Sequence, residues 1–356
     1  MSAAPAPSAG APGTADPDTL AERVIAWQRR HGRHGLPWHG SRDPYRVWLS
    51  EIMLQQTQVA TVLAYYDRFL QRFPEVSALA VAPLDEVLAL WSGLGYYSRA
   101  RNLHRCAQVV MADHGGAFPA SAAVLATLPG IGRSTAAAIA AFCFGERAAI
   151  LDGNVKRVLT RALGFGDDLA EVRHERRLWQ LAEALLPAQG VERYTQGLMD
   201  LGADICAQRR PRCTECPLQS LCVAHAQGRP EAYPVKTRKL RRSRRQHALL
   251  WLQHGERVWL QQRPPRGVWA GLWSLPEADD VVHWWQRASA WPGEGEALPP
   301  FVHVLTHVDW TLSPLRWQLP GHAAVPELGD LTGRWFSIDE ALQLGLPAPI
   351  RRLLSR

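Results

Sequence analysis

The chain has 356 residues, 47% of them hydrophobic, so it can form two domains that each bury a core. No stretch of about 18 apolar residues occurs, which excludes a predicted membrane span and the functions that need one. The formal net charge of +7 favours a polyanionic partner. Four of the six cysteines lie within residues 206–222, which is typical of metal ligation in a reducing cytosol rather than of disulfides.

Residues 1–17 are rich in Ala, Pro, Gly and Ser and lack the basic and apolar regions of a signal peptide. They are therefore predicted to be a disordered tail. Asp18 or Thr19, followed by Glu22, is typical of a helix start, so a helix is expected over residues 20–30.

A second helix is expected over residues 45–59, where apolar side chains face nearly every direction, so the helix should be buried. Glu51 is the odd residue on it. A buried glutamate is usually paired or functional, and burial without a cation raises its pKa toward neutrality. The alternative is a glutamate that caps the helix start. Gln55 and Gln56 are polar amides on the same helix and suit contacts with base edges, although solvent exposure would also explain them.

Residues 91–101 place Tyr96 and Tyr97 at a glycine-rich turn, with Arg99 and Arg101 just behind them. Aromatic tips backed by cations are typical of a wedge that enters between bases while the cations contact phosphates. A packed loop without a ligand is the alternative for this segment.

The stretch from Leu128 to Ser134 reads Leu-Pro-Gly-Ile-Gly-Arg-Ser and is followed by an Ala-rich helix over residues 135–144. Gly130 and Gly132 permit positive φ and have no Cβ to hold a ligand away. Successive N–H groups at a helix start form a site for one phosphate, so the stretch predicts a helix-hairpin-helix clamp on a DNA backbone. An ordinary turn between helices is the alternative.

Asp152 precedes Gly153 and Asn154 and a helix expected over residues 155–163, in the position of an N-cap. The helix dipole and the free amides there favour the ionised carboxylate, although most such aspartates are only caps. A protonated Glu51 and an anionic Asp152 would divide the work as in glycoside hydrolysis, one protonating the leaving group and the other facing positive charge on the sugar. Cleavage of an N-glycosidic bond between base and sugar needs the same two roles.

The clustered cysteines have the spacing C-x6-C-x2-C-x5-C, with Cys206, Cys213, Cys216 and Cys222 as the candidate ligands. A tetrahedral zinc site is one possibility, but structural zinc usually uses two C-x2-C knuckles and only one is present. Four thiolates in one compact loop also suit a [4Fe–4S] cluster.

The composition changes at residue 233, where a basic linker is expected over residues 233–246. Beyond it, a β-rich α+β domain is expected over 247–356, with strands over 247–254, 257–262, 300–307 and 315–319. Residues 267–276 resemble the Nudix (MutT-like) fold, but the acidic metal-binding box of its hydrolases does not follow, so the domain is interpreted as a binding module. Thr306 and His307 are candidates to contact a base edge; an ordinary strand end is the alternative.

Taken together, residues from about 20 to 356 resemble the MutY-type adenine DNA glycosylases of the endonuclease III-like superfamily. Three motifs carry the resemblance: WLSEIMLQQTQV at 48–59, LPGIGRST at 128–135 and LDGNVKRV at 151–158. The cysteine spacing supports them. The resemblance implies a multidomain protein, with an all-α helix-hairpin-helix glycosylase domain over 18–232 that includes a [4Fe–4S] loop, and a Nudix-like domain that recognises the lesion.

The resemblance implies that the chain removes adenine mispaired with 8-oxoguanine or G in double-stranded DNA, by flipping it into a pocket. Glu51 is then the acid, and Asp152 stabilises an oxocarbenium-like sugar. Tyr96 and Gln56 would fill the duplex beside the lesion, and Asn154 and Lys156 would lie near the site. Lyase-type relatives have a catalytic lysine where this chain has Ser134, so a monofunctional enzyme is expected. The family's Phe-Ser-His loop corresponds to residues 305–307, where Leu replaces the aromatic residue while Thr306 and His307 keep the hydroxyl and the imidazole.

Two other functions are weighed against this hypothesis. An endonuclease III-type bifunctional glycosylase/lyase is disfavoured by Ser134 and by the appended second domain. A non-catalytic iron–sulfur DNA-binding protein that senses redox state would leave the pair Glu51 and Asp152 without a role. The chain is expected to be a monomer in the cytoplasm, associated with the nucleoid and not with a membrane.

Overall fold

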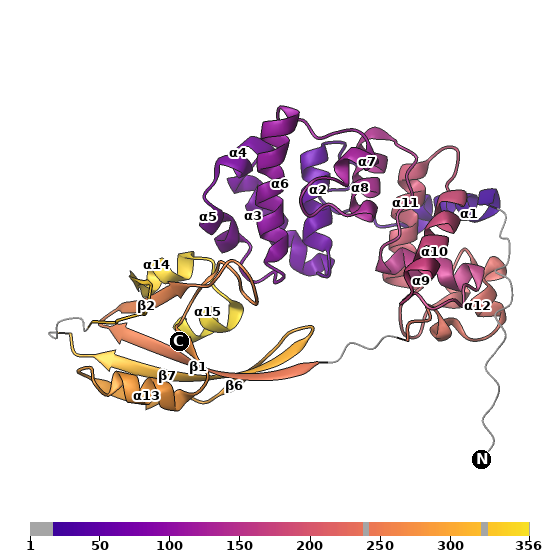
Figure 1. The fold of residues 1–356 in the computed structure, drawn as a ribbon. Helices are drawn as coiled ribbons and strands as arrows, with labels where there is room; N and C mark the ends of the chain where they lie inside the picture. The colour runs from indigo at the N-terminus through magenta and orange to yellow at the C-terminus, as the bar shows by residue number, and fades with distance from the viewer. Residues whose placement is uncertain (1–16, 238–241, 322–326, 356) are drawn as a thin grey trace, which may run out of the picture. The chain divides into compact units, whose positions relative to one another are not determined.

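The computed structural model describes residues 17–237, 242–321 and 327–355 (Figure 1). The tail predicted over residues 1–17 lies outside this part of the chain except for Pro17, which begins a helix. The chain forms two compact units, and each takes two stretches of sequence. The first unit comprises Met1–Gln56 and Val109–Lys239, and the second comprises Thr57–Gln108 and Leu240–Arg356.

The first unit is helical. Its core gathers buried side chains from α1, α8, α9, α10 and α11, with Leu20, Val155, Leu159 and Leu201 fully buried. The helices are α1 (Pro17–His31), α2 (Pro44–Leu54), α7 (Ala122–Leu125), α8 (Arg133–Ile139), α9 (Gly153–Leu163), α10 (Val172–Ala184), α11 (Val191–Asp200) and α12 (Val223–Ala226), with π-helical turns η1 (Ala140–Phe144) and η2 (Leu201–Ile205) and 3-10 turns η3 (Cys213–Glu215), η4 (Gln219–Leu221) and η5 (Pro230–Ala232).

Helix α2 begins as its sequence predicts but ends earlier. Asp43 Oδ1 accepts a hydrogen bond from the Tyr45 amide at 2.9 Å, and Pro44 occupies the first turn, where a missing N–H costs nothing. The helix was expected to run to residue 59 but ends at Leu54. The reason is the backbone of Gln55, whose ψ of 112° is outside the helical region, and Gln56 follows it with a left-handed φ of 57°. The next helix, α3, starts at Val59.

The Ala-rich helix predicted over residues 135–144 is confirmed. It is formed by α8 and the π-helical turn η1, which follows it without a break. Gly145 ends it with a φ of 71°, as a C-terminal glycine in the left-handed conformation commonly does. Asp152 caps α9 as predicted, with Oδ1 accepting from the Val155 amide at 2.8 Å.

The helical stretch of the second unit contains α3 (Val59–Arg72), α4 (Val76–Val81), α5 (Leu84–Leu90) and most of α6 (Ser98–His114). Phe69 lies at its centre and contacts Phe73 and Trp91 edge to face, with ring centroids 5.1 and 6.1 Å away. All three rings are fully buried. The loop of residues 91–97 joins α5 to α6.

The C-terminal part of the second unit is built on a mixed sheet of eight strands. Its centre is a long parallel pair, β1 with β7, in register from Ser243 opposite Val308 to His254 opposite Leu319. The strands are β1 (Ser243–His254), β2 (Arg257–Gln262), β3 (Trp273–Ser274), β4 (Glu277–Ala278), β5 (Glu294–Ala297), β6 (Phe301–Val304), β7 (Val308–Leu319) and β8 (Arg334–Ser337), with helices α13 (Val281–Ala288), α14 (Ile338–Gln343) and α15 (Ala348–Leu354).

Alternate residues of the central strands form the core of this part. Leu250 and Leu252 on β1 and Leu315 on β7 are fully buried and belong to one core cluster with Trp284 of α13. Helix α13 lies along β7 in Figure 1. Strand β7 starts seven residues before the predicted strand 315–319, because its pairing with β1 continues through the whole stretch. The α+β class predicted for this part is confirmed.

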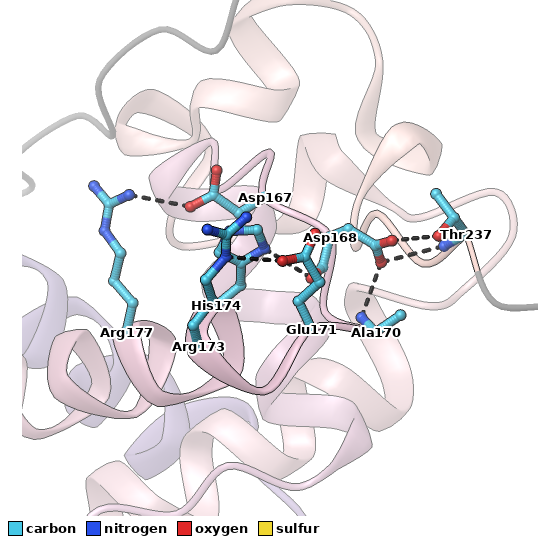
Figure 2. A network of polar contacts seen from close by, with 8 residues as sticks. All are labelled: Asp167, Asp168, Ala170, Glu171, Arg173, His174, Arg177 and Thr237. Carbon is cyan, nitrogen blue, oxygen red and sulfur yellow. Dashed lines mark hydrogen bonds and ion pairs between the residues drawn. The ribbon is translucent and has the colours of Figure 1, made fainter.

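The predicted linker, residues 233–246, is ordered at both ends. Ser243–Gln246 belong to β1, because β7 offers a partner strand for them. At the other end, Asp168 Oδ1 accepts from the amides of Ala170 and Thr237 at 2.9 and 3.2 Å, and the Thr237 hydroxyl donates to the same carboxylate (Figure 2). These hydrogen bonds lower the pKa of Asp168, and the bond from the Thr237 hydroxyl has the largest effect. Residues 238–241 lie outside the described chain.

None of the described helices combines the length and the apolar character needed to cross a membrane.

Candidate active site and nucleic-acid interface

Glu51 lies in the middle of α2, in the first unit. The alternative that it caps a helix start is wrong, because Asp43 caps this helix and the Ser50 hydroxyl donates to the Val47 carbonyl at 2.8 Å. Burial raises the pKa of Glu51 to about 7, and the negative charge of Asp152 acts in the same direction. No described residue forms a hydrogen bond with its carboxyl group. Glu51 is therefore an acid that titrates near neutrality with a free carboxyl group.

Asp152, at the N-terminus of α9, differs from Glu51 because amide donors and cations surround its carboxylate. Burial raises its pKa, but the amides of Val155 and Asn154 and the charges of Arg157 and Lys156 act against that shift. The predicted effect of the cap is therefore present, although burial outweighs it. Glu51 has no such compensating group among the described residues, so burial favours the protonated form of Glu51 more than that of Asp152.

Three further side chains surround Asp152. Ser134 Oγ accepts from the Leu151 amide at 2.8 Å and so fixes the backbone just before the aspartate. Asn154 Oδ1 accepts from Arg157 Nη2 at 2.9 Å. Lys156 follows Asp152 by one helical turn and forms an ion pair with Glu175 of α10.

The hairpin between α7 and α8 has the geometry of a backbone clamp. Gly130 has a φ of 78°, and Gly132 is the N-cap residue of α8. Gly130 and Gly132 are both exposed, and nothing lies within 4 Å of a Cβ placed on Gly132. Buried Leu128 and Ile131 anchor the turn, so a phosphate can approach its amides without displacing a side chain.

The two glutamines after α2 differ. Gln55 is half-buried, and its Nε2 donates to Thr135 Oγ1 at 3.3 Å. Gln56 is exposed with a φ of 57°, and Tyr96, in the second unit, has 44% of its surface exposed and a φ of 47°. A left-handed backbone costs a non-glycine residue about 1–3 kcal/mol and is concentrated at functional sites. The two residues predicted to enter DNA both carry this strain.

Arg99 behaves differently from its prediction. Instead of facing a phosphate it is 8% exposed, and its Nη2 donates to Thr57 Oγ1 and to the carbonyls of Leu94 and Gly95 at 3.0–3.2 Å. Its guanidinium carbon also lies 5.4 Å from the centre of the Tyr96 ring. Burial lowers the pKa of Arg99 to about 10. Arg99 points inward because the carbonyls of the turn need a side chain with several N–H donors. This arginine therefore supports the loop from inside.

The candidate lesion-reading residues lie in the turn between β6 and β7. Thr306 and His307 are exposed there. The turn is held by the Leu305 amide, which donates to the Val308 carbonyl at 2.9 Å, and by Arg242, whose Nη2 donates to the Leu305 carbonyl at 3.0 Å. Thr306 Oγ1 lies 3.0 Å from the Tyr96 hydroxyl, within hydrogen-bonding distance. The fold therefore joins the tip of the Tyr96 loop to this turn, although 210 residues separate them in sequence.

The four clustered cysteines are all half-buried free thiols. Burial above all raises the pKa of Cys216 to about 12, and the charges of Cys206, Cys222 and Cys213 act in the same direction. No three His, Cys, Asp or Glu side chains in the described ranges are arranged to hold a single metal ion.

The sequence analysis did not predict that two arginines of α9 contact the cysteine loop. Arg161 is 2% exposed; its Nη1 donates to Cys206 Sγ at 3.2 Å and to the Ala207 carbonyl at 2.8 Å. Arg157 Nε donates to the Cys206 carbonyl at 2.7 Å while its Nη2 contacts Asn154. Their i,i+4 spacing was the available signal, because such residues share one face of a helix.

Two family profiles match the chain: the HhH-GPD superfamily of base excision DNA repair proteins over residues 49–184, and the NUDIX domain over residues 247–356. The adenine DNA glycosylase of Buchnera aphidicola subsp. Baizongia pistaciae is 34% identical to the chain, covering 94% of this chain and 95% of that relative. The chain belongs to the adenine DNA glycosylase family. The family member of Rattus norvegicus is also 34% identical, over 92% of this chain and 75% of the relative.

One solved structure of another DNA glycosylase is also similar to the chain. A thermostable thymine-DNA glycosylase matches with a TM-score of 0.53 and 30% identity, covering 59% of this chain and 97% of that structure. The chain is thus a hydrolase of base excision repair with a helical glycosylase part and a Nudix-like part, and both the fold class and the resemblance are confirmed. The alternative of a non-catalytic redox sensor is set aside.

Proposed function

We propose that the chain excises adenine opposite 8-oxoguanine or G in double-stranded DNA, with Glu51 as the general acid. The observation that carries the proposal is the half-buried carboxyl of Glu51, without a hydrogen-bond partner among the described residues and with a pKa raised to about 7, beside Asp152. A carboxyl of this kind holds its proton to near neutral pH and is available to a ligand, as a general acid must be.

The chemistry follows from the two carboxyl groups. Glu51 gives its proton to a ring nitrogen of the flipped adenine while the bond between the base and C1′ breaks. The sugar becomes oxocarbenium-like, and the Asp152 carboxylate stabilises its positive charge at short range. Water then adds to C1′, and its lost proton restores Glu51. Ser134 acts on this step by fixing the backbone before Asp152.

Single-turnover base release tests the proposal. Duplexes with A opposite 8-oxoguanine, A opposite G, and T opposite G separate adenine excision from thymine excision, the activity for which the similar thymine-DNA glycosylase is named. We expect adenine release from the first two and none from the third. Thymine release without adenine release would refute the proposed substrate.

The pH dependence of base release should report Glu51. Because its folded pKa is raised to about 7 and the protonated form is the acid, the rate is full below pH 7 and falls about tenfold per unit above it. Protonation of Asp152 adds a second fall on the acid side. In Glu51→Gln the alkaline fall should vanish from the residual rate, whereas a wild-type rate that is flat from about pH 6 to 9 would contradict this assignment.

We propose that the hairpin glycines bind one backbone phosphate. Gln56 of the first unit and Tyr96 of the second are each proposed to enter the duplex beside the 8-oxoguanine, and Gln55 is proposed to contact the DNA. The exposure and the strained backbones of Gln56 and Tyr96 support this role. The partner is a chromosomal duplex, so the protein acts at the nucleoid in the cytoplasm, as a monomer.

Thr306 and His307 are proposed to read 8-oxoguanine, which differs from guanine at N7–H and O8. Replacing both with alanine should leave excision opposite G nearly unchanged and reduce the preference for A opposite 8-oxoguanine by roughly tenfold to a hundredfold, the value of one or two base contacts. Single-turnover rates on the two duplexes measure the ratio. The control replaces an exposed histidine and a threonine elsewhere, His283→Ala with Thr332→Ala. Equal slowing on both duplexes would contradict the assignment.

A [4Fe–4S] cluster fits the four cysteines better than zinc does. Structural zinc usually uses two C-x2-C knuckles, and the spacing C-x6-C-x2-C-x5-C contains only one. A cluster takes one thiolate per iron and spaces the sulfurs apart. Cys206, Cys213, Cys216 and Cys222 would hold it, with Arg161 bonded to the Cys206 sulfur. When bound it fixes the loop, and the excision step does not pass through it.

Ser134 supports a monofunctional enzyme, because a hydroxyl cannot form a Schiff base. Lys156, one helical turn beyond Asp152, is the candidate amine, but its ion pair with Glu175 holds it. Borohydride should trap at most a weak protein–DNA adduct, which Lys156→Ala should remove. Glu175→Gln frees the amine and should strengthen the adduct severalfold, since a neutral amine is the nucleophile. Strand cleavage that keeps pace with base release would instead indicate a bifunctional enzyme.

A further inference from the structure

The loop that carries Tyr96 is anchored at its base to the C-terminal part of the second unit. Ser92 Oγ donates to the Leu346 carbonyl at 3.0 Å, and the hydroxyl of buried Tyr97 donates to the same oxygen at 3.0 Å. Leu346 is fully buried between α14 and α15. One carbonyl oxygen therefore holds both ends of the loop, on either side of Tyr96.

Arg351 of α15 completes this anchor. Its Nε donates to Ser92 Oγ at 3.2 Å, and its two terminal nitrogens donate to the carbonyls of Leu342 and Leu344 at 2.6 and 3.0 Å. Ser92 thus accepts one hydrogen bond from Arg351 and donates another to the Leu346 carbonyl. Because the guanidinium is a rigid planar fork, these bonds fix the loop and the end of α14 in one arrangement.

Close packing surrounds these polar contacts. Arg101 Nη1, at the start of α6, donates to the Ala270 carbonyl at 2.7 Å. A Cβ on Gly93, which has a φ of 107°, would lie 2.1 Å from the Tyr65 hydroxyl. The loop therefore has little freedom to shift while its anchor is intact.

We infer that Arg351 is a positioning residue for Tyr96, acting through Ser92 and the Leu346 carbonyl. The inference rests on the proposed function in one respect, that Tyr96 enters the duplex. A strained residue persists only where its surroundings over-determine the backbone, and the Arg351 bonds are part of those surroundings. The C-terminal part thus has a second task besides reading the lesion: it presents Tyr96 to DNA, whichever base lies opposite the adenine.

Arg351→Ala tests this role against Arg352→Ala, which removes the same charge from an exposed neighbour on the same helix. We expect Arg351→Ala to slow adenine release about tenfold, and by the same factor opposite 8-oxoguanine and opposite G, as the loss of an orienting charge-assisted hydrogen bond does. Arg352→Ala should stay near the wild-type rates. The ratio of the rates opposite 8-oxoguanine and opposite G should stay constant in Arg351→Ala. That constancy distinguishes the role of Arg351 from the lesion reading proposed for Thr306 and His307.

A double-substitution cycle gives the readout that general destabilisation would not reproduce. If Arg351 acts only through the Tyr96 loop, Arg351→Ala should add nothing to Tyr96→Ala, because the group it positions is already gone. A 2-aminopurine placed beside the 8-oxoguanine supplies a second readout. Saturating wild-type protein should unstack it and raise its fluorescence, and Arg351→Ala should lower that rise.

The fluorescence measurement needs no catalysis, so it separates this inference from the proposed function. Wild-type protein that unstacks the probe without releasing adenine would overturn the proposed function and leave the positioning role intact. Should Arg351→Ala not fold, Ser92→Ala and Tyr97→Phe each remove one bond to Leu346 and carry the same test. The inference would be overturned if the rate losses of Arg351→Ala and Tyr96→Ala multiply in the double variant. It would also be overturned if Arg351→Ala raises the 2-aminopurine fluorescence as much as the wild type does.

Discussion

Glu51→Gln is expected to lower the single-turnover rate of adenine release by roughly three orders of magnitude, within the range of general-acid contributions, while duplex binding is retained. Glutamine keeps the size of the side chain but has no acidic proton at the place where the carboxyl lies free beside Asp152. The measurement is base release with enzyme in excess over a duplex containing A opposite 8-oxoguanine, together with a binding titration.

The matched control for Glu51 is Glu22→Gln, which removes an exposed carboxylate from α1 in the same unit. Its rate should equal that of the wild type. Glu51→Gln should also keep the wild-type melting temperature or raise it slightly, because a buried carboxyl without a partner contributes no stability. A Glu51→Gln rate within about tenfold of the wild type, below the general-acid range, would remove Glu51 from the mechanism.

Arg161→Met is expected to destabilise the first unit by about 3 kcal/mol, because it removes a buried donor from several part-buried acceptors. The guanidinium of Arg161 donates to the carbonyls of Tyr233, Cys206, Ala207 and Gln208 as well as to the Cys206 sulfur. Methionine fills a similar volume without any donor. Thermal unfolding should show the loss, and the iron content per chain should fall with it if a cluster occupies the loop.

Arg209→Met is the control for Arg161, since it removes an exposed arginine from the cysteine loop. Its melting temperature should stay close to that of the wild type, because exposed substitutions usually change stability by less than about 0.5 kcal/mol. If both variants unfold at the same temperature, the hydrogen bonds of Arg161 do not hold the loop.

Local signals in the sequence predicted local structure well. Asp152 caps α9 as predicted, because an N-cap needs only a side chain within reach of the next few amides. The Ala-rich helix and the strand over residues 257–262 follow from their periodicity. Predictions failed where the backbone departs from regular geometry. Helix α2 ends early because Gln55 has an extended ψ and Gln56 a left-handed φ, which no propensity of glutamine indicates.

The sequence by itself determined the family and singled out Glu51 and Asp152 as the candidate carboxyl groups, since both depend on motifs and residue types. Only the tertiary structure decided how those groups behave. The pKa of Glu51 depends on burial and on Asp152, 101 positions away, and Arg99 turns inward because the loop presents its carbonyls there. Arg351 reaches Ser92 across 259 residues. Such pairings depend on which surfaces pack together, and that is a property of the whole fold rather than of any local stretch.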